Sequence, residues 1–184
     1  MSTKIVNLRC LALALSIAFA GTAQFVSTSG HAQDAMGQLT VTGKVSVNGK
    51  PAATGDIVAS GDGVQTAKGS SAVVSLGKLG RVEALPESKA NLSFDGGSIK
   101  VALESGRVRL SSSSGTAARS STRDGEAVAD ATQENSFTVD TTCGDTLVSV
   151  QTGRVELRAG GTVKQIAAGS QDSAGTAKPG CRRQ

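Results

Sequence analysis

Aromatic residues and histidine are nearly absent from this sequence of 184 residues. It contains no tryptophan, no tyrosine, four phenylalanines and one histidine, His31. Sugar-binding sites and single-stranded nucleic-acid sites generally rest on aromatic faces, so the composition disfavours both. His31 lies in an N-terminal segment that we expect to be removed, which excludes catalytic triads with a histidine base and metal sites built on imidazole.

Long apolar runs are also scarce, and the longest one is too short to span a membrane. The ten residues Leu11 to Ala20 follow Lys4 and Arg9 and precede small residues, the layout of a secretory signal peptide. A spanning helix needs roughly 20 apolar residues, so cleavage is expected instead of stable membrane insertion. Two sites fit the small-x-small rule, after Ala23 and after Ala32. Cleavage after Ala32, which would remove residues 1–32, is favoured because Phe25 and Val26 extend the apolar region, and Ala23 is the alternative. The mature protein is therefore expected in the periplasm or secreted.

The charge balance predicts no polyanionic partner. Removing Lys4 and Arg9 from the 19 basic residues leaves 17 against 15 acidic ones, a net charge of +2. A surface of such mixed charge provides no strong field for nucleic acid or anionic lipid. The sequence also predicts no cofactor.

Two cysteines, Cys143 and Cys181, remain after the expected cleavage. In an oxidising compartment an even pair is expected to form a disulfide, here closing a loop of 37 intervening residues. In the chain-entropy model such a bridge contributes up to ~4 kcal/mol. The alternative, a pair of reactive thiols or half of a metal site, lacks histidine partners and close cysteine spacing.

Short alternating segments separated by glycine turns occupy residues 39–169. Leu39, Val41, Val45 and Val47 alternate with polar residues, and Asn48-Gly49 then suits a type I′ turn. Residues 61–76 read as two further short strands joined by tight turns. Strands of about five residues at intervals of roughly 8–12 predict a single all-β domain, either a β-sandwich or jelly roll or a β-solenoid-like stack.

The motif Gly-Arg-Val occurs three times, beginning at Gly80, Gly106 and Gly153. Each copy predicts a turn glycine, an exposed arginine and a buried valine at the start of a strand. If these strands are neighbours, the arginines form one face that binds a carboxylate-bearing or anionic partner. The candidate residues of this face are Arg81, Arg107, Arg109, Arg154 and Arg158. The interleaved Glu83, Glu104 and Glu156 favour the alternative of an ordinary cross-strand charge lattice.

Two segments lack the strand pattern. Residues 111–135 contain almost no large apolar side chain, so we expect a long polar insertion that is either a binding loop or a solvated one. Residues 170–184 are small and polar and predict a flexible tail, tethered by the proposed Cys143–Cys181 disulfide.

Carboxylates are the remaining candidates for acid–base chemistry. Asp56, Asp62, Asp95 and Asp145 each lie beside a glycine in a predicted turn, where aspartate accepts backbone N–H hydrogen bonds. Nothing in their spacing forces two of them together. A carboxylate-dependent hydrolase is therefore the last-ranked hypothesis, and no catalytic residue or metal ligand is predicted.

Several motifs together carry a family resemblance. They are Gly55-Asp-Ile-Val, Gly61-Asp-Gly-Val-Gln-Thr, Leu85-Pro-Glu-Ser and Gly106-Arg-Val-Arg-Leu, within a run that begins at Val45-Ser-Val-Asn-Gly-Lys-Pro. The run from Val45 to Leu110 resembles the FecR-like domain, whose pattern is a Gly-Asp turn, an alternating strand, a Leu/Val-x-Pro-x-Ser/Thr step and a closing Gly-x-Val. Residues 137–169 match that pattern more loosely.

The resemblance implies an exported, non-enzymatic all-β domain. In founding members this domain lies outside the inner membrane and relays the state of an outer-membrane receptor to a sigma factor. This sequence has neither a retained transmembrane helix nor a cytosolic anti-sigma region. The expectation is thus a free-standing periplasmic or secreted module that binds a protein or cell-envelope component, with a structural envelope or matrix protein as the alternative.

Overall fold

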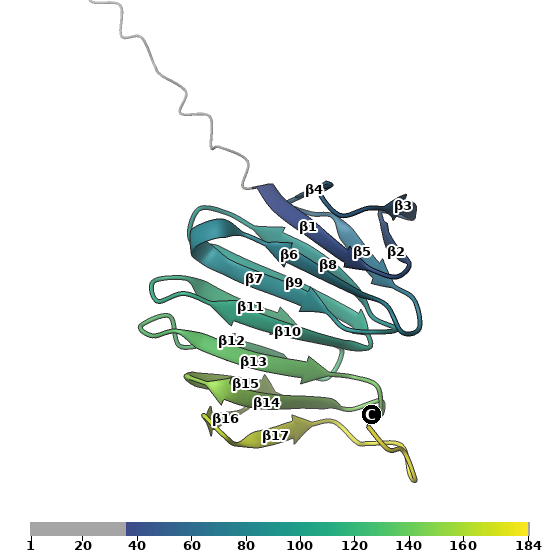
Figure 1. The fold of residues 1–184 in the computed structure, drawn as a ribbon. Coiled ribbons are helices and arrows are strands. Elements are labelled where there is room, and N and C mark those ends of the chain that lie inside the picture. Colours follow the sequence, from purple (N-terminus) through teal and green to yellow (C-terminus); the bar gives the residue numbers. More distant parts are fainter. Residues whose placement is uncertain (1–35, 184) are drawn as a thin grey trace, which may run out of the picture. The chain divides into compact units, whose positions relative to one another are not determined.

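The computed structural model describes residues 36–183, which form two β-sheets and one short 3-10 helix, η1 (Gly77–Leu79) (Figure 1). Sheet A has eight strands, in the spatial order β17 (Gln171–Ala174), β14 (Thr146–Thr152), β13 (Asn135–Asp140), β10 (Arg107–Ser112), β7 (Gly80–Ala84), β6 (Ser71–Ser75), β1 (Met36–Thr42) and β4 (Ile57–Ala59). Sheet B has nine, in the order β16 (Thr162–Ala167), β15 (Arg154–Ala159), β12 (Glu126–Ala129), β11 (Ala117–Ser121), β9 (Ser98–Ser105), β8 (Lys89–Phe94), β5 (Gly63–Thr66), β2 (Val45–Val47) and β3 (Lys50–Ala52).

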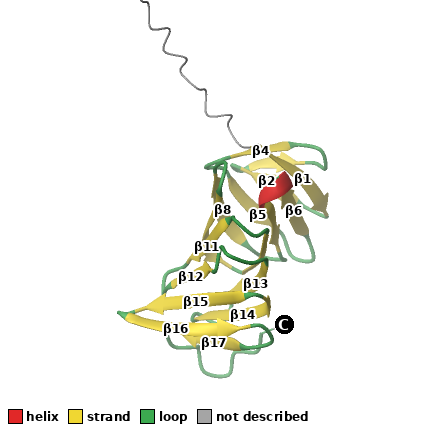
Figure 2. Cartoon of the chain, turned by 90° about the vertical axis from the view of Figure 1, so that its left-hand side faces the viewer, coloured by secondary structure: helices red, strands yellow, loops and turns green. Residues whose placement is uncertain are grey.

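The two sheets pack as the layers of a sandwich (Figure 2). From β6 onward the chain adds strands alternately to sheet A and sheet B, mostly two at a time, so that both sheets grow in the same direction. The prediction of an all-β domain is therefore confirmed, as a sandwich whose strands are added progressively. Within residues 36–183 no helix is long and apolar enough to cross a membrane. The expected signal peptide lies outside the described residues.

One hydrophobic core fills the space between the sheets. The predicted alternation is observed in most strands: in β13, for example, Phe137 and Val139 are fully buried while Ser136 and Thr138 face outward. The largest fully buried side chains come from both sheets: Phe137, Leu39, Ile99, Leu110, Leu157 and Ile166. Because strand side chains alternate with period two, one face of each sheet is left for polar residues.

The turn predicted at Asn48-Gly49 is confirmed. Both residues have positive φ, 52° and 76°, as a type I′ turn requires, and they join β2 to β3 with Val47 opposite Lys50. Pro51 lies in β3 at the edge of sheet B, where its missing N–H costs no ladder hydrogen bond.

The Gly-Arg-Val motifs do mark strand starts, and in two of them the arginine N–H donates to the side chain of a buried polar residue. The N–H of Arg107 donates to Ser88 Oγ at 2.8 Å, and the N–H of Arg154 donates to Asn135 Oδ1 at 3.1 Å. A side chain on Gly106 or Gly153 would collide with that same acceptor residue, and both glycines have φ near the left-handed region, 88° and 85°. Local packing therefore requires glycine at these positions.

The prediction of a polar insertion at residues 111–135 is wrong. The segment contains the end of β10 and all of β11 and β12. These two strands pair with each other, β11 also pairs with β9, and β12 also pairs with β15. Its inward positions are taken by Ala118, Ser120, Ala127 and Ala129, each no more than 5% exposed. Backbone pairing on both sides orders these strands, although such small side chains bury little apolar area.

The prediction of a flexible tail at residues 170–184 is also wrong in its first part. Residues Gln171–Ala174 form β17, which pairs with β14 and completes the edge of sheet A. Lys164 of β16 donates to Asp172 Oδ1 at 2.8 Å and links the last strands of the two sheets. Within the described part of the predicted tail, the residues after β17 lack a strand.

Candidate functional site

The five candidate arginines do not form one face. Arg81 on β7 and Arg107 and Arg109 on β10 belong to neighbouring strands of sheet A. Arg154 and Arg158 lie on β15, in sheet B. The prediction of a single arginine face is wrong because the third Gly-Arg-Val motif starts a strand of the other layer.

The three glutamates interleaved with these arginines all form ion pairs. Glu83 Oε2 lies 3.2 Å from Arg109 Nη1 on the adjacent strand, and Glu104 Oε2 lies 2.6 Å from Lys89 Nζ. Glu156 pairs at 2.6 Å with Arg158, two residues along the same strand. A hydrogen bond from Lys89 lowers the pKa of Glu104. Hydrogen bonds from Arg158 and Gln165 lower the pKa of Glu156. The charge-lattice alternative thus accounts for most of these charges.

Two of the five arginines, Arg81 and Arg154, are exposed and form no ion pair within residues 36–183. Of the two, Arg81 has a hydroxyl-bearing residue opposite it on each neighbouring strand. It stands in a row of outward-facing residues on five adjacent strands, in which each member lies directly opposite the next. The members of this row are Ser75, Arg81, Ser111, Ser136 and Thr152. Register alone places these hydroxyls and one guanidinium side by side.

The row lines a shallow cavity of about 390 Å³ on the outer side of sheet A. We call it the hydroxyl groove and define it by Ser75, Arg81, Ser111, Glu134, Ser136 and Thr152. Hydroxyl groups donate and accept hydrogen bonds, and Arg81 and Glu134 add one exposed charge of each sign. The groove can therefore hydrogen-bond a polar, extended partner such as a peptide segment or an envelope polymer.

Sequence reasoning missed the hydroxyl groove. The first two serines of the run that begins at Ser111 lie in β10 and face opposite sides of the strand. Ser111 faces outward, while Ser112 is buried with 5% exposure. Ser136 and Thr152 come from distant parts of the sequence. The only local signal was the alternation of serines with buried apolar residues.

Three of the glycine-flanked aspartates have the structural role predicted for them. Asp56 Oδ2 and Asp62 Oδ2 accept the N–H of Ala53 and of Ala59, at 2.8 and 2.7 Å, in two copies of the same turn. Asp95 accepts hydrogen bonds from the hydroxyl of Ser98 and the N–H of Gly97, which lower its pKa. Among residues 36–183, no three Asp, Glu, Cys or His side chains are grouped to hold a metal ion.

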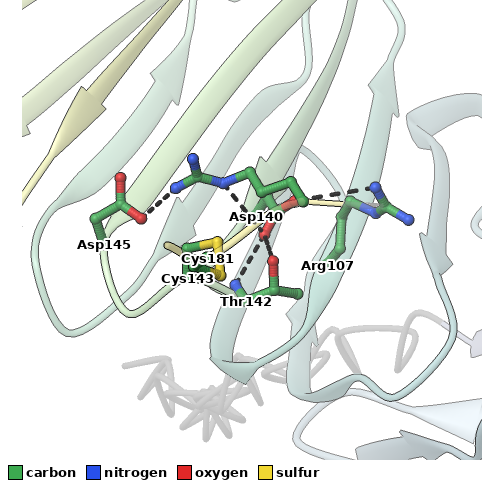
Figure 3. The surroundings of a disulfide bond; sticks show 7 residues. Arg107, Asp140, Thr142, Cys143, Asp145 and Cys181 are labelled. Atoms are coloured by element: carbon green, nitrogen blue, oxygen red, sulfur yellow. Dashed lines mark hydrogen bonds and ion pairs between the residues drawn. A yellow bond between two sulfur atoms is a disulfide. The ribbon is translucent and has the colours of Figure 1, made fainter. Parts of the chain in front are cut away.

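Asp145 differs from these three, and its assignment to turn formation is incomplete. Its side chain is 5% exposed and forms an ion pair with the guanidinium of Arg183, near the C-terminus. Figure 3 shows it beside the disulfide that joins Cys143 to Cys181. Asp145 and Arg183 are 38 positions apart in the sequence, which hid this pairing from sequence reasoning.

The predicted disulfide is present, and its two cysteines differ in exposure. Cys143 is 1% exposed, whereas Cys181 is exposed. The N–H of Lys178 also donates to the carbonyl oxygen of Cys143 at 2.8 Å. These two links hold the strand-free segment 175–183 against the turn between β13 and β14.

The fold resembles a solved one. Two crystal structures of a "putative anti-sigma factor" from Parabacteroides distasonis, at 1.65 and 2.50 Å resolution, match with a TM-score of 0.51 and 20% sequence identity. Each match covers 59% of this chain and 52% of the other, so this chain spans about half the length of that protein. No family model and no curated protein matches the sequence. At this identity the similarity establishes a shared fold over the matched part of the chain.

Proposed function

We propose that this protein is a non-enzymatic, FecR-like binding or sensing module that acts in the periplasm or outside the cell and contacts a protein or a cell-envelope component. The observation that carries the proposal is the fold similarity to the Parabacteroides distasonis protein, which is described as a "putative anti-sigma factor". The motifs between Val45 and Leu110 support the same family independently of the fold. A fold of this kind serves as a scaffold, so function depends on the surface it presents.

The compartment is supported by the disulfide. Structural disulfides persist in oxidising surroundings and are rare in the reducing cytosol. The signal-like pattern of residues 1–32 agrees with export. A binding role is supported by the hydroxyl groove, where exposed polar groups from five strands converge. A non-enzymatic role is supported by the engagement of Asp56, Asp62 and Asp95 in turns.

A pull-down from envelope extract tests the proposal. We expect Arg81→Glu, which reverses the exposed charge, and Ser136→Arg, which fills the groove, each to reduce the captured partner at least about ten-fold, a loss of roughly 1.4 kcal/mol in binding. Lys100→Glu is the matched control, because Lys100 is exposed on β9 in sheet B and undergoes the same reversal of charge.

The outcome is read by comparing the three variants by quantitative mass spectrometry. The proposal predicts that Lys100→Glu captures as much partner as the wild type. Equal capture by all variants, or no specific partner with the wild type, would contradict it. Circular dichroism of each variant excludes loss of fold as the cause.

A further inference from the structure

Two buried carboxylates lie at adjoining ends of β13 and β14. The side chains of Asp140 and Asp145 are 6% and 5% exposed, and the turn between them carries Cys143 (Figure 3). An ionised carboxylate in such a position is costly unless it is paired and hydrogen-bonded. The partners of these two groups therefore decide what the site can hold.

The partners of Asp140 belong mainly to the sandwich itself. Its Oδ1 accepts the N–H of Thr142 at 2.8 Å and the hydroxyl of Thr142 at 2.6 Å. Its Oδ2 lies 3.9 Å from Nη1 of Arg107, on the neighbouring strand β10. Asp140 thus remains compensated whatever the C-terminal segment does.

Asp145 depends on the C-terminal segment. In the described chain its carboxylate has one ion pair, with Arg183 Nη2. The same guanidinium places its Nε 3.8 Å from Asp140 Oδ1, so one arginine bridges both carboxylates. The planar fork of a guanidinium can face two carboxylates at once, whereas an ammonium group is a single point charge.

The two sides of this contact are held with different rigidity. Asp140 is the last residue of β13 and Asp145 directly precedes β14, whereas Arg183 lies in the strand-free segment beyond the exposed Cys181. A cavity of about 420 Å³ lies beside the turn that joins the two carboxylates and is lined in part by Thr142, Gly144 and Lys178. The carboxylates are therefore held by the sandwich independently of Arg183, and open space lies beside the turn that connects them.

We infer that Asp140 and Asp145 form a guanidinium-binding site, which Arg183 occupies in cis and which an arginine side chain of a partner fills when Arg183 is displaced. The site is separate from the hydroxyl groove and does not depend on the function proposed for it. The ligand class is an arginine side chain in a peptide, selected by two buried carboxylates that flank one turn.

The test is a titration of the Arg183→Ala variant with N-acetyl-L-arginine N-methylamide, followed by 15N–1H NMR. The variant keeps both cysteines, and Arg182→Ala is the matched control, because Arg182 is the exposed neighbour in the same segment. In Arg183→Ala we expect saturable shifts of the amides of Thr142, Gly144 and Asp145. The dissociation constant from these shifts should be at least ten-fold lower than in the wild type or in Arg182→Ala. The corresponding lysine amide is expected to bind at least five-fold more weakly.

A second pair of variants guards against loss of fold. Arg183→Lys keeps a positive charge at the site, and we expect the arginine amide to bind it more weakly than Arg183→Ala and more tightly than the wild type. Adding Asp145→Asn to either variant should abolish the saturable shifts. Absence of saturable binding in both Arg183→Ala and Arg183→Lys, equal binding to the wild type, or equal binding of the lysine amide would overturn the inference.

Discussion

Replacing Phe137 by alanine is expected to lower the free energy of unfolding by about 3–5 kcal/mol. Phe137 is fully buried on β13, which is paired with β10 on one side and β14 on the other. Because the backbone of β13 is paired on both sides, it can move only a little to fill the space left behind. The cost therefore combines lost apolar burial with an unfilled cavity.

Urea denaturation followed by far-ultraviolet circular dichroism measures this effect, because the sequence has no tryptophan or tyrosine for fluorescence. Ile57→Ala is the control: Ile57 is 58% exposed on the edge strand β4, and a change of no more than about 0.5 kcal/mol is expected. A loss below about 1 kcal/mol for Phe137→Ala would mean that Phe137 is not part of a tightly packed core.

Replacing both Cys143 and Cys181 by alanine is expected to lower the free energy of unfolding by up to ~4 kcal/mol. The bridge joins residues 38 positions apart and restricts the unfolded chain, an effect that is independent of strand packing. The same change frees the segment after β17, since one backbone hydrogen bond and the Arg183 ion pair are its other described links to the β13–β14 turn. Limited proteolysis should then cut the double variant after Arg182 or Arg183 while the sandwich persists.

The matched comparison uses reductant. Dithiothreitol should bring the wild type to the stability of the double variant and leave the double variant unchanged. If the wild type and the double variant unfold at the same urea concentration without reductant, the disulfide does not contribute to stability. Equal rates of cleavage near the C-terminus would show that it does not hold the segment either.

The parts of the fold that are local in the sequence could be predicted from it. The alternation from Leu39 to Val47 and the Asn48-Gly49 turn depend on neighbouring residues, and the Cys143–Cys181 pair had no competing partner among the residues expected after cleavage. The strands β11 and β12 could not be predicted, because alanine and serine at inward positions do not produce an apolar pattern. Their order comes from pairing with strands elsewhere in the sequence.

The candidate sites depend on contacts between distant residues, which explains why sequence reasoning found them only in part. Arg81 was identified as a candidate, but its neighbours Ser111 and Ser136 follow from strand register. The layer to which β15 belongs, and hence the separation of Arg154 from Arg81, follows from the topology. No local pattern links Asp145 to Arg183.

The most direct test of the proposed function is photo-cross-linking in cells through a benzophenone amino acid at Ser136. Ser136 lies in the hydroxyl groove, and Lys100 on the outer face of sheet B serves as the comparison position. The proposal predicts one discrete ultraviolet-dependent product from Ser136, containing an extracytoplasmic protein or envelope component, and none from Lys100. No product from Ser136, or the same product from both positions, would contradict the assignment of the groove as the partner-binding surface.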